Sequence, residues 1–336
     1  MSRDACDVTV VVPAFESARW IAATIASIRA QTLAPRAIVV VDNGSRDDTA
    51  AEAARAGAQV ILTPGGGPSR ARNAGIRAAS SAWIAFCDAD DLWEPQKLER
   101  HAAAAQRCPD AVATFSDWRS FDDQGFLHET TLCNDPAYRS VRRTRVAPGI
   151  VHLERASLQR SFYRSMFVLT SAAVFRRDAL ADAGLFDERL RIAEDYDLFL
   201  RVFALGTAAA IEEPLVRYRR HAHGISGDGL VNAAAHADLW RIIEGSPERY
   251  PPGALAFVRR DRIVRPRIAG EFAARRGRFA EACALLGPSL RSRPTVRAAL
   301  WYGISLACDN PAARPAFAFA RRTWARRPWR YAGARS

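Results

Sequence analysis

The sequence has few of the features that mark secreted, zinc-thiolate or membrane-spanning proteins. Its six cysteines include no CxxC pair, and none lies near a histidine in a zinc-ligand pattern. The N-terminus lacks the apolar segment of a signal peptide, and the late apolar run from Ala298 to Cys308 is shorter than the ~20 residues that span a bilayer. These absences predict reduced thiols and a cytoplasmic location, with any membrane contact peripheral and at the inner membrane face.

The two common phosphate-binding glycine motifs are also absent. The run Gly65-Gly66-Gly67 is not followed by the Lys-Ser/Thr of a P-loop, and the sequence contains no GxGxxG. Two interpretations of this glycine run stay open: a loop that lets a ligand approach the backbone, and a plain linker.

Basic residues outnumber acidic ones, with a formal net charge of +12 and a pI of about 10.2. Such an excess favours polyanionic partners, namely nucleic acid, an anionic membrane or nucleotide phosphates, but a solvated arginine-rich surface explains it equally well. The C-terminal tail, Ala320 to Tyr331, interleaves Arg with Trp and Tyr. Such a tail suits an anionic membrane, single-stranded nucleic acid or simple solvation, and we predict peripheral membrane contact.

Short apolar runs alternate with helical patterns in the first hundred residues. The runs are Val8–Val12, Ala37–Val41, Gln59–Leu62 and Trp83–Cys87. Apolar runs of this length that end abruptly in polar residues are typical of strands buried on both faces of a sheet. The alternation of strands and helices predicts an α/β fold of Rossmann-like type, with a mostly parallel sheet flanked by helices.

The pattern changes further along the chain. Strands are predicted at Ala111–Ser116 and Phe167–Phe175, and a long loop or hairpin region at Phe121–Gly149. From about residue 228 the strand signals disappear, and helices are predicted at Glu271–Leu286 and Val296–Cys308 with Gly287 and Pro288 between them. We therefore predict one domain over residues 1–227 and an all-helical C-terminal extension over residues 228–336.

An acidic turn follows the fourth apolar run. Asp88, Asp90 and Asp91 crowd the end of this strand, where ligands of open α/β sheets bind. Carboxylates this close repel one another unless a cation or hydrogen-bond donors compensate. Oxygen ligands suit Mg²⁺ or Mn²⁺, and Mg²⁺ is often shared with substrate phosphates, so the turn indicates a metal and a phosphorylated ligand. An acidic loop that caps the next helix is the alternative.

The order of five motifs is more informative than any one of them. The motifs are VVPAFESARWIAATIASIRAQT, VVVDNGSRDDT, GGGPSRARNAGI, WIAFCDADDLW and EDYDLFLR. Together they resemble the family 2 glycosyltransferases, which are inverting enzymes of the GT-A fold that use nucleotide-diphosphate sugars. The resemblance covers roughly Val8 to Ser226.

The resemblance implies a donor site at the strand ends. Residues after the first strand would line the nucleotide pocket, and these are Pro13, Ala14 and Glu16. Asp42 would hydrogen-bond the base, typically uracil, so a UDP-sugar is the expected donor. Arg72 would lie near the nucleotide and Asp88 near the ribose.

The resemblance also implies metal and catalytic residues. Asp90, the second aspartate of the DXD motif Asp88-Ala89-Asp90, would bind the divalent metal that bridges the diphosphate. His221 matches a family histidine near the diphosphate or the metal. Asp195, in Glu194-Asp195, matches the catalytic base, although acidic residues in a helix's first turn also serve as caps. The acceptor, a glycan or a lipid-linked glycan, would contact the unmatched segment Phe121–Arg164.

Other functions stay open at this point. A nucleotidyltransferase that makes nucleotide sugars would share an α/β nucleotide fold and carboxylate–metal chemistry. A nucleic-acid-binding protein is supported only by charge and the tail, and we expect no nucleic-acid partner. An inactive relative that binds nucleotide sugars is a third alternative, against which the intact acidic positions argue. The expected function is sugar transfer in cell-surface polysaccharide or glycolipid synthesis.

Overall fold

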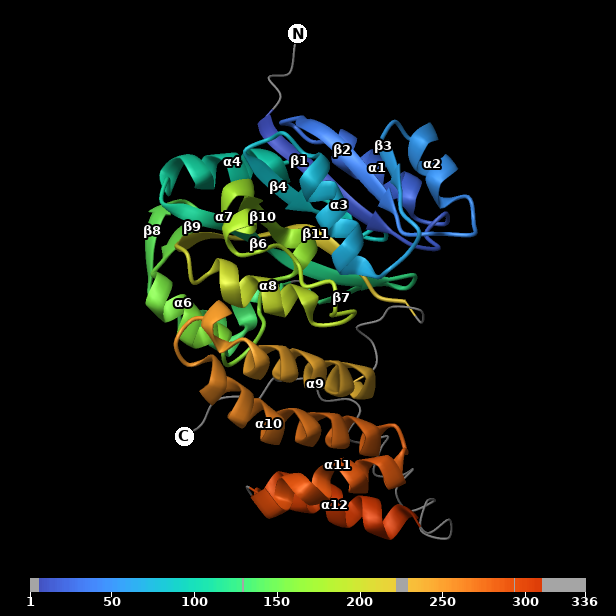
Figure 1. The fold of residues 1–336 in the computed structure, drawn as a ribbon, viewed down its shortest axis with the longest axis vertical. Coiled ribbons are helices and arrows are strands. Elements are labelled where there is room, and N and C mark those ends of the chain that lie inside the picture. Colours follow the sequence, from blue (N-terminus) through green and yellow to red (C-terminus); the bar gives the residue numbers. More distant parts are fainter. Residues whose placement is uncertain (1–5, 129, 222–228, 293, 310–336) are drawn as a thin grey trace. The chain divides into compact units, whose positions relative to one another are not determined.

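The computed structural model describes residues 6–128, 130–221, 229–292 and 294–309 (Figure 1). The chain divides into two compact units, of which the first ends at His221 and the second follows it. The basic aromatic tail predicted to contact membranes, Ala320 to Tyr331, lies outside the described residues.

The first unit alternates strands and helices in its N-terminal part and then becomes more irregular. Its strands are β1 (Cys6–Ala14), β2 (Pro35–Asp42), β3 (Gln59–Leu62), β4 (Trp83–Phe86), β5 (Leu92–Trp93), β6 (Ala111–Asp122), β7 (Gly125–His128), β8 (Arg143–Ala147), β9 (Ile150–Leu153), β10 (Ala173–Arg176) and β11 (Thr207–Arg219). Its α-helices are α1 (Ile21–Arg29), α2 (Thr49–Arg55), α3 (Pro68–Ala78), α4 (Lys97–Arg107), α5 (Pro136–Arg139), α6 (Arg155–Phe162), α7 (Arg177–Asp182) and α8 (Glu194–Val202). Two short 3₁₀ helices are η1 (Leu132–Asn134) and η2 (Thr170–Ala172).

One sheet organises this unit. Its main path has the order β3-β2-β1-β4-β10-β6-β11-β9-β8, while β5 pairs with β11 and β7 pairs with β6. The N-terminal strands β3, β2, β1 and β4 are parallel, β10 is antiparallel between β4 and β6, and β6 is again parallel to β11. The α/β fold class predicted from the strand–helix alternation is confirmed. The parallel strands bring the polar residues that follow β1, β2 and β4 to a single edge of the sheet.

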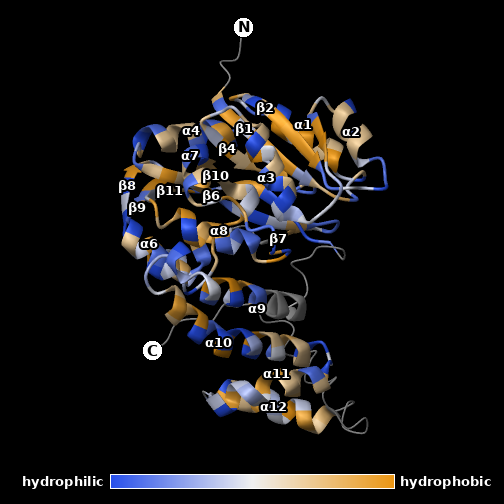
Figure 2. Ribbon diagram, in the orientation of Figure 1, coloured by the Kyte–Doolittle hydropathy of each residue, from blue (hydrophilic) through white to orange (hydrophobic). Residues whose placement is uncertain are grey.

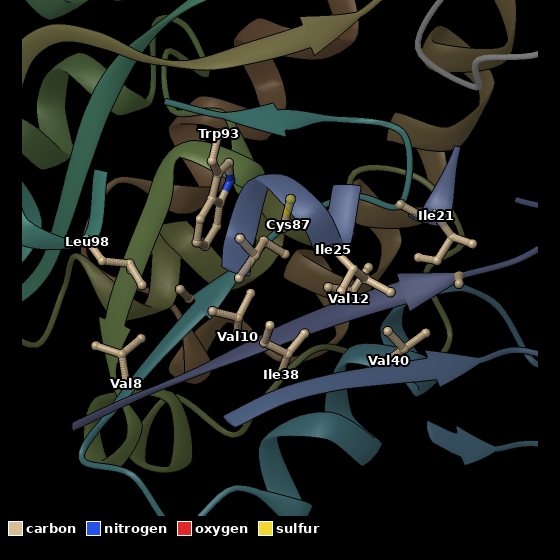
Figure 3. Close-up of a cluster of buried hydrophobic side chains, with 14 of the residues drawn as sticks. Val8, Val10, Val12, Ile21, Ile25, Ile38, Val40, Cys87, Trp93 and Leu98 are labelled. Carbon is tan, nitrogen blue, oxygen red and sulfur yellow. The ribbon is translucent and has the colours of Figure 1, made fainter. Parts of the chain in front are cut away.

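The core explains why β1 and β2 read as continuous apolar runs. Val8, Val10 and Val12 point toward one face and pack with Ile21 and Ile25 of α1, as Figure 3 shows. The alternate residues of β2, Val39 and Val41, pack with Ala71 of α3 on the other face. Because both faces are covered, neither strand alternates polar with apolar residues, and both appear hydrophobic in Figure 2.

Two further contacts fix the helices that carry the functional candidates. A Cβ atom at Gly75 would lie 2.3 Å from Cγ1 of Val11, so glycine lets α3 approach β1 closely. The ring of Phe199 in α8 lies 5.0 Å from that of Phe175 in β10. Helices α3 and α8 are therefore anchored to the sheet through direct side-chain contact.

Several predicted boundaries in the first unit are wrong. The predicted strand Phe167–Phe175 is instead the 3₁₀ helix η2 followed by the short strand β10. Strand β6 continues past Ser116 to Asp122 and leads into the hairpin strand β7. The segment Phe121–Gly149, predicted as a long loop or hairpin region, contains the β6–β7 hairpin and also two short helices and β8.

The described part of the second unit consists of helices. These are α9 (Gly229–Gly245), η4 (Pro247–Arg249), α10 (Ala254–Arg275), α11 (Phe279–Ser292) and α12 (Val296–Asp309). The prediction of one helix over Glu271–Leu286 is wrong. Gly277, with φ of 78°, lies in the turn that separates α10 from α11. Gly287 and Pro288 lie inside α11, where packing overrides their low helix propensity. Among the described helices, none is long and apolar enough to cross a membrane.

The only lysine of the chain, Lys97, is completely buried at the start of α4. Its Nζ lies 4.1 Å from the centroid of the Trp93 ring, and no described residue accepts a hydrogen bond from it. Burial lowers the pKa of Lys97 to about 7. An arginine at this position would stay charged, so lysine is the basic residue that can become neutral here.

The depressed pKa of Lys97 predicts a stability change with pH. The unfolded chain holds this proton more tightly, so the folded state gains stability as pH rises from about 7 toward 10. Lys97→Met should raise the free energy of unfolding at pH 7 by roughly 1–3 kcal/mol and flatten the rise with pH, because it removes a buried charge. Urea unfolding at pH 7 and pH 9.5 measures both effects.

The control for this prediction is Arg55→Met, which removes an exposed charge and should change stability by less than about 0.5 kcal/mol. Isotope-labelled lysine gives a single side-chain NMR signal in this chain, so its titration reports the pKa directly. A midpoint near the ordinary lysine value would contradict the buried, depressed state.

Candidate active site

The first group of candidate residues lies where β1 and β2 end. Ala14 faces Asp42 in the parallel register, and the N–H of Asn43 donates to the carbonyl of Ala14 (2.8 Å). Asp42 is buried, and its Oδ1 accepts hydrogen bonds from the hydroxyl (2.5 Å) and the N–H (3.1 Å) of Ser45. The sheet thus places Pro13, Ala14 and Asp42, which were predicted from separate motifs, next to one another.

Glu16 joins this group through backbone contacts. Its N–H donates to the Ser45 hydroxyl oxygen (3.0 Å), and its carboxylate accepts the N–H of Arg46 (2.9 Å). Glu16 has φ of 48°, a left-handed conformation that is uncommon outside glycine. The loops after β1 and β2 are therefore held together at the sheet edge.

The acidic turn after β4 is fixed from two sides. The N–H of Asp88 donates to the hydroxyl oxygen of Ser171 (2.9 Å). Asp91 is fully buried and accepts the N–H of Arg219 (3.0 Å), whose Nε donates to the carbonyl of Asp90 (2.9 Å). The end of β11 thus fastens the turn, and the side chains of Asp88 and Asp90 are left partly accessible.

Asp90 and His221, both of which the resemblance assigns to the metal or the diphosphate, lie together. The Oδ2 of Asp90 and the Nε2 of His221 are 2.7 Å apart, and the His221 ring lies 4.5 Å from the ring of Trp20. Burial, followed by the charge of Asp88, raises the pKa of Asp90, whereas the contact with His221 lowers it. The repulsion expected between crowded carboxylates is therefore present and only partly compensated.

The donor set at this turn is compatible with a divalent ion. Within the described ranges, no three His, Cys, Asp or Glu side chains form a ready-made metal cluster. Mg²⁺ needs only one or two protein carboxylates when substrate phosphates complete its coordination. Asp90 can supply one carboxylate, and the raised pKa of this group is the response expected where a cation would relieve repulsion.

The second group of candidates centres on the start of α8. Arg72 donates from one terminal nitrogen to Oε1 of Glu194 (2.7 Å) and from the other to Oδ1 of Asp88 (2.8 Å). The next residue, Asp195, accepts a hydrogen bond from the hydroxyl of Thr170 (3.2 Å). Three elements, α3, the turn after β4 and α8, therefore meet at one guanidinium.

Charge and burial set the proton affinities in this group. Burial raises the pKa of Asp195, and the charge of Arg72 lowers it. Burial and the neighbouring Asp195 raise the pKa of Glu194 to about 7, against the opposing effect of Arg72. The pKa of Arg72 itself is raised by Asp88 and Glu194 despite its burial. Arg72 thus keeps two buried carboxylates close together without full neutralisation of either.

The alternative role of Asp195, helix capping, has partial support. Its Oδ1 accepts the N–H of Tyr196 (2.7 Å) in the first turn of α8. The residue at the cap position is Ala193, which offers no side-chain acceptor. One carboxylate oxygen of Asp195 therefore serves the helix end, while the other, Oδ2, is directed to Thr170.

Sequence reasoning missed three supporting residues. Thr170 and Ser171, which contact Asp195 and Asp88, fall in the segment predicted to be a strand, where their side chains had no assigned role. Asp117 is buried within β6, and its carboxylate accepts the N–H groups of Thr131 (2.9 Å) and Leu132 (2.7 Å). Asp117 thus anchors the segment predicted to meet the acceptor, an effect of distant backbone groups that no local pattern reveals.

Comparison with known proteins gives the family of the chain. Residues 9–184, more than half of the chain, match the sequence model of Glycosyl transferase family 2. The chain belongs to glycosyltransferase family 2. The matched region includes the strand ends with Asp42, Asp88 and Asp90, and it stops before Asp195 and His221.

Relatives and solved structures agree with this assignment. The succinoglycan biosynthesis protein ExoO of Rhizobium meliloti is 35% identical over 226 residues, which cover 64% of this chain and 60% of ExoO. The structure of S. aureus TarS 1-349 in complex with UDP-GlcNAc has a TM-score of 0.55 at 17% identity, covering 94% of this chain and 92% of TarS 1-349. The mannosyltransferase PcManGT of Pyrobaculum calidifontis, in complex with GDP-Man and Mn²⁺, has a TM-score of 0.53 at 19% identity, covering 97% and 90%. These structures support the GT-A type of fold for this family 2 member.

Proposed function

We propose that this protein transfers a sugar, with inversion, from a nucleoside-diphosphate sugar to an acceptor hydroxyl in the synthesis of a cell-surface polysaccharide or glycolipid. The observation that carries the proposal is the link from Asp195 through Glu194 and Arg72 to Asp88, which joins a carboxylate base to the donor side of the site. Similarity to ExoO supports a polysaccharide product. Membership of a glycosyltransferase family favours sugar transfer over nucleotidyl transfer or nucleic-acid binding.

The proposed donor site uses the two strand-end groups. Asp42 would accept a hydrogen bond from the base through Oδ2, because Ser45 occupies Oδ1 and no described residue donates to Oδ2. Pro13, Ala14 and Glu16 would border the nucleotide, with Asp88 at the ribose and Arg72 behind it. UDP is the proposed nucleotide, a choice consistent with the UDP-GlcNAc complex of TarS, whereas the complex of PcManGT holds GDP-Man.

The proposed chemistry assigns separate tasks to two carboxylates. Asp90, with His221 beside it, would hold Mg²⁺ or Mn²⁺, and a bound divalent metal supplies Lewis-acid stabilisation of the leaving diphosphate. Asp195 would take the proton of the acceptor hydroxyl as that oxygen attacks the anomeric carbon from the face opposite the diphosphate. Oriented binding of both substrates supplies much of the remaining rate enhancement.

A screen of nucleotide sugars for hydrolysis and transfer, with and without Mn²⁺, tests the proposal as a whole. We expect turnover with a UDP-sugar that depends on the added metal. Nucleotidyl transfer from a sugar phosphate, or no turnover of any nucleotide sugar, would contradict the proposed function.

The division of tasks predicts different effects of two isosteric substitutions. Asp90→Asn should weaken metal-dependent donor binding and transfer together, because it removes the metal carboxylate. Asp195→Asn should leave nucleotide binding nearly intact and lower turnover by about 10²–10⁴-fold, the usual contribution of a general base. Calorimetry of nucleotide binding with Mn²⁺, together with transfer rates, measures both effects.

Thermal melts of the same two variants distinguish catalysis from capping. If Asp195 acted only as a first-turn cap, Asp195→Asn would cost roughly 1 kcal/mol of stability and leave turnover almost unchanged. Near wild-type turnover in Asp195→Asn would remove the main support for the proposed base.

The sequence also supports peripheral membrane contact through the tail that begins at Ala320. Co-sedimentation with anionic vesicles should be stronger for the full-length protein than for a chain truncated before Ala320. Equal binding of the two proteins, or no binding by either, would exclude this role of the tail.

A further inference from the structure

Arg72 connects two parts of the site that do different chemistry. Its side chain is only 6% exposed, and its two terminal nitrogens reach Glu194 on α8 and Asp88 on the turn after β4. Its guanidinium carbon lies 5.4 Å from the centroid of the Phe186 ring. A guanidinium that is buried, stacked and bonded at both ends has a fixed geometry, because its planar fork can meet these partners in few orientations.

The backbone before Glu194 is also constrained. Ala193 has φ of 64° and ψ of 17°, the left-handed region, which is unfavourable for a residue with a Cβ atom. Such a conformation persists only where the surrounding contacts determine it, and it occurs often at functional sites. In the first turn of α8, the ion pair between Glu194 and Arg72 connects this helix to α3.

We propose that Glu194 is a positioning residue, which holds Asp195 in its working orientation by fixing the first turn of α8 to Arg72 and, through Arg72, to the donor-side residue Asp88. This inference rests on the proposed role of Asp195 as the base. It adds a role that the DXD and base assignments leave unfilled, because Glu194 has its carboxylate on Arg72 and not on a reacting group.

The arrangement explains how the base and the donor stay in register. Glu194 and Asp195 are adjacent, so fixing the Glu194 carboxylate sets the direction in which Asp195 leaves the helix. The hydroxyl of Thr170 donates a hydrogen bond to Oδ2 of Asp195 (3.2 Å). The charged groups that face one another here are Arg72 from α3, Asp88 from the turn after β4, and Glu194 and Asp195 from α8.

A double-mutant cycle on the full-length protein tests the inference. Glu194→Gln keeps the shape of the side chain and removes its charge. If Glu194 acts through Asp195, this change should lower kcat by about 10-fold in the native background and by less than about 2-fold in the Asp195→Asn background. The donor KM should change by less than about 3-fold in both backgrounds.

The pH profile gives a second readout that a purely structural role would not move. Burial and the neighbouring Asp195 raise the pKa of Glu194 to about 7, so its ion pair with Arg72 forms as pH rises through 7, and the acidic limb of kcat/KM in the wild type should follow this ionisation. In Glu194→Gln this titration is absent, so the acidic limb should move to lower pH because only Asp195 is left to titrate. An equal loss of kcat in both backgrounds, or an unmoved acidic limb, would overturn the inference.

Asp197→Asn is a matched control on the same helix. Asp197 is fully buried and pairs with Arg201 four residues later, so it shares the helix, burial and ion pairing of Glu194, while this ion pair stays within α8. This variant should melt at a lower temperature and keep the kcat and pH profile of the folded wild type. If Asp195→Asn itself keeps full activity, Asp195 is not the base and the proposed function fails. If Asp195→Asn loses activity but Glu194→Gln lowers kcat equally in both backgrounds, only the positioning role of Glu194 is rejected.

Discussion

Electrostatic crowding at one edge of the sheet is the constraint on which the rest of the site depends. Parallel strands bring Asp42, Asp88 and Asp90 to the same edge, and α8 adds Glu194 and Asp195. Separate partners stabilise these carboxylates in the folded state. Ser45 hydrogen-bonds Asp42, His221 contacts Asp90, and Arg72 pairs with both Asp88 and Glu194. The buried arginine lowers the repulsion among these carboxylates without neutralising every charge, and the proposed function assigns the remaining acidic groups to a metal and to a proton.

How far the site could be predicted depended on the range of the interactions involved. The strands before Asp42 and Asp88 were predictable, because burial on both faces makes a continuous apolar run. The family resemblance assigned Asp90 and His221 to the metal or the diphosphate, but only the structure shows their direct contact. The roles of Thr170 and Asp117 were not predictable, because their partners are distant in sequence. Thr170 contacts Asp195, 25 residues away, and Asp117 contacts Thr131, 14 residues away.

Errors in the fold had similar causes. The segment Phe167–Phe175 is apolar because it packs in the interior, and a buried 3₁₀ turn and a strand leave the same hydrophobic pattern. In the second unit, Gly277 breaks a helix that the periodicity carried through, whereas Pro288 is accommodated inside one. Local propensity decided the first case and packing the second.

The stereochemistry of transfer is the sharpest test of the proposed mechanism, because a single displacement assisted by Asp195 must invert the anomeric carbon. The measurement is the anomeric proton coupling of the newly formed glycoside, recorded by NMR with an α-linked nucleotide sugar as donor. Direct displacement predicts a β-glycoside. An α-glycoside would contradict direct displacement and the base assigned to Asp195.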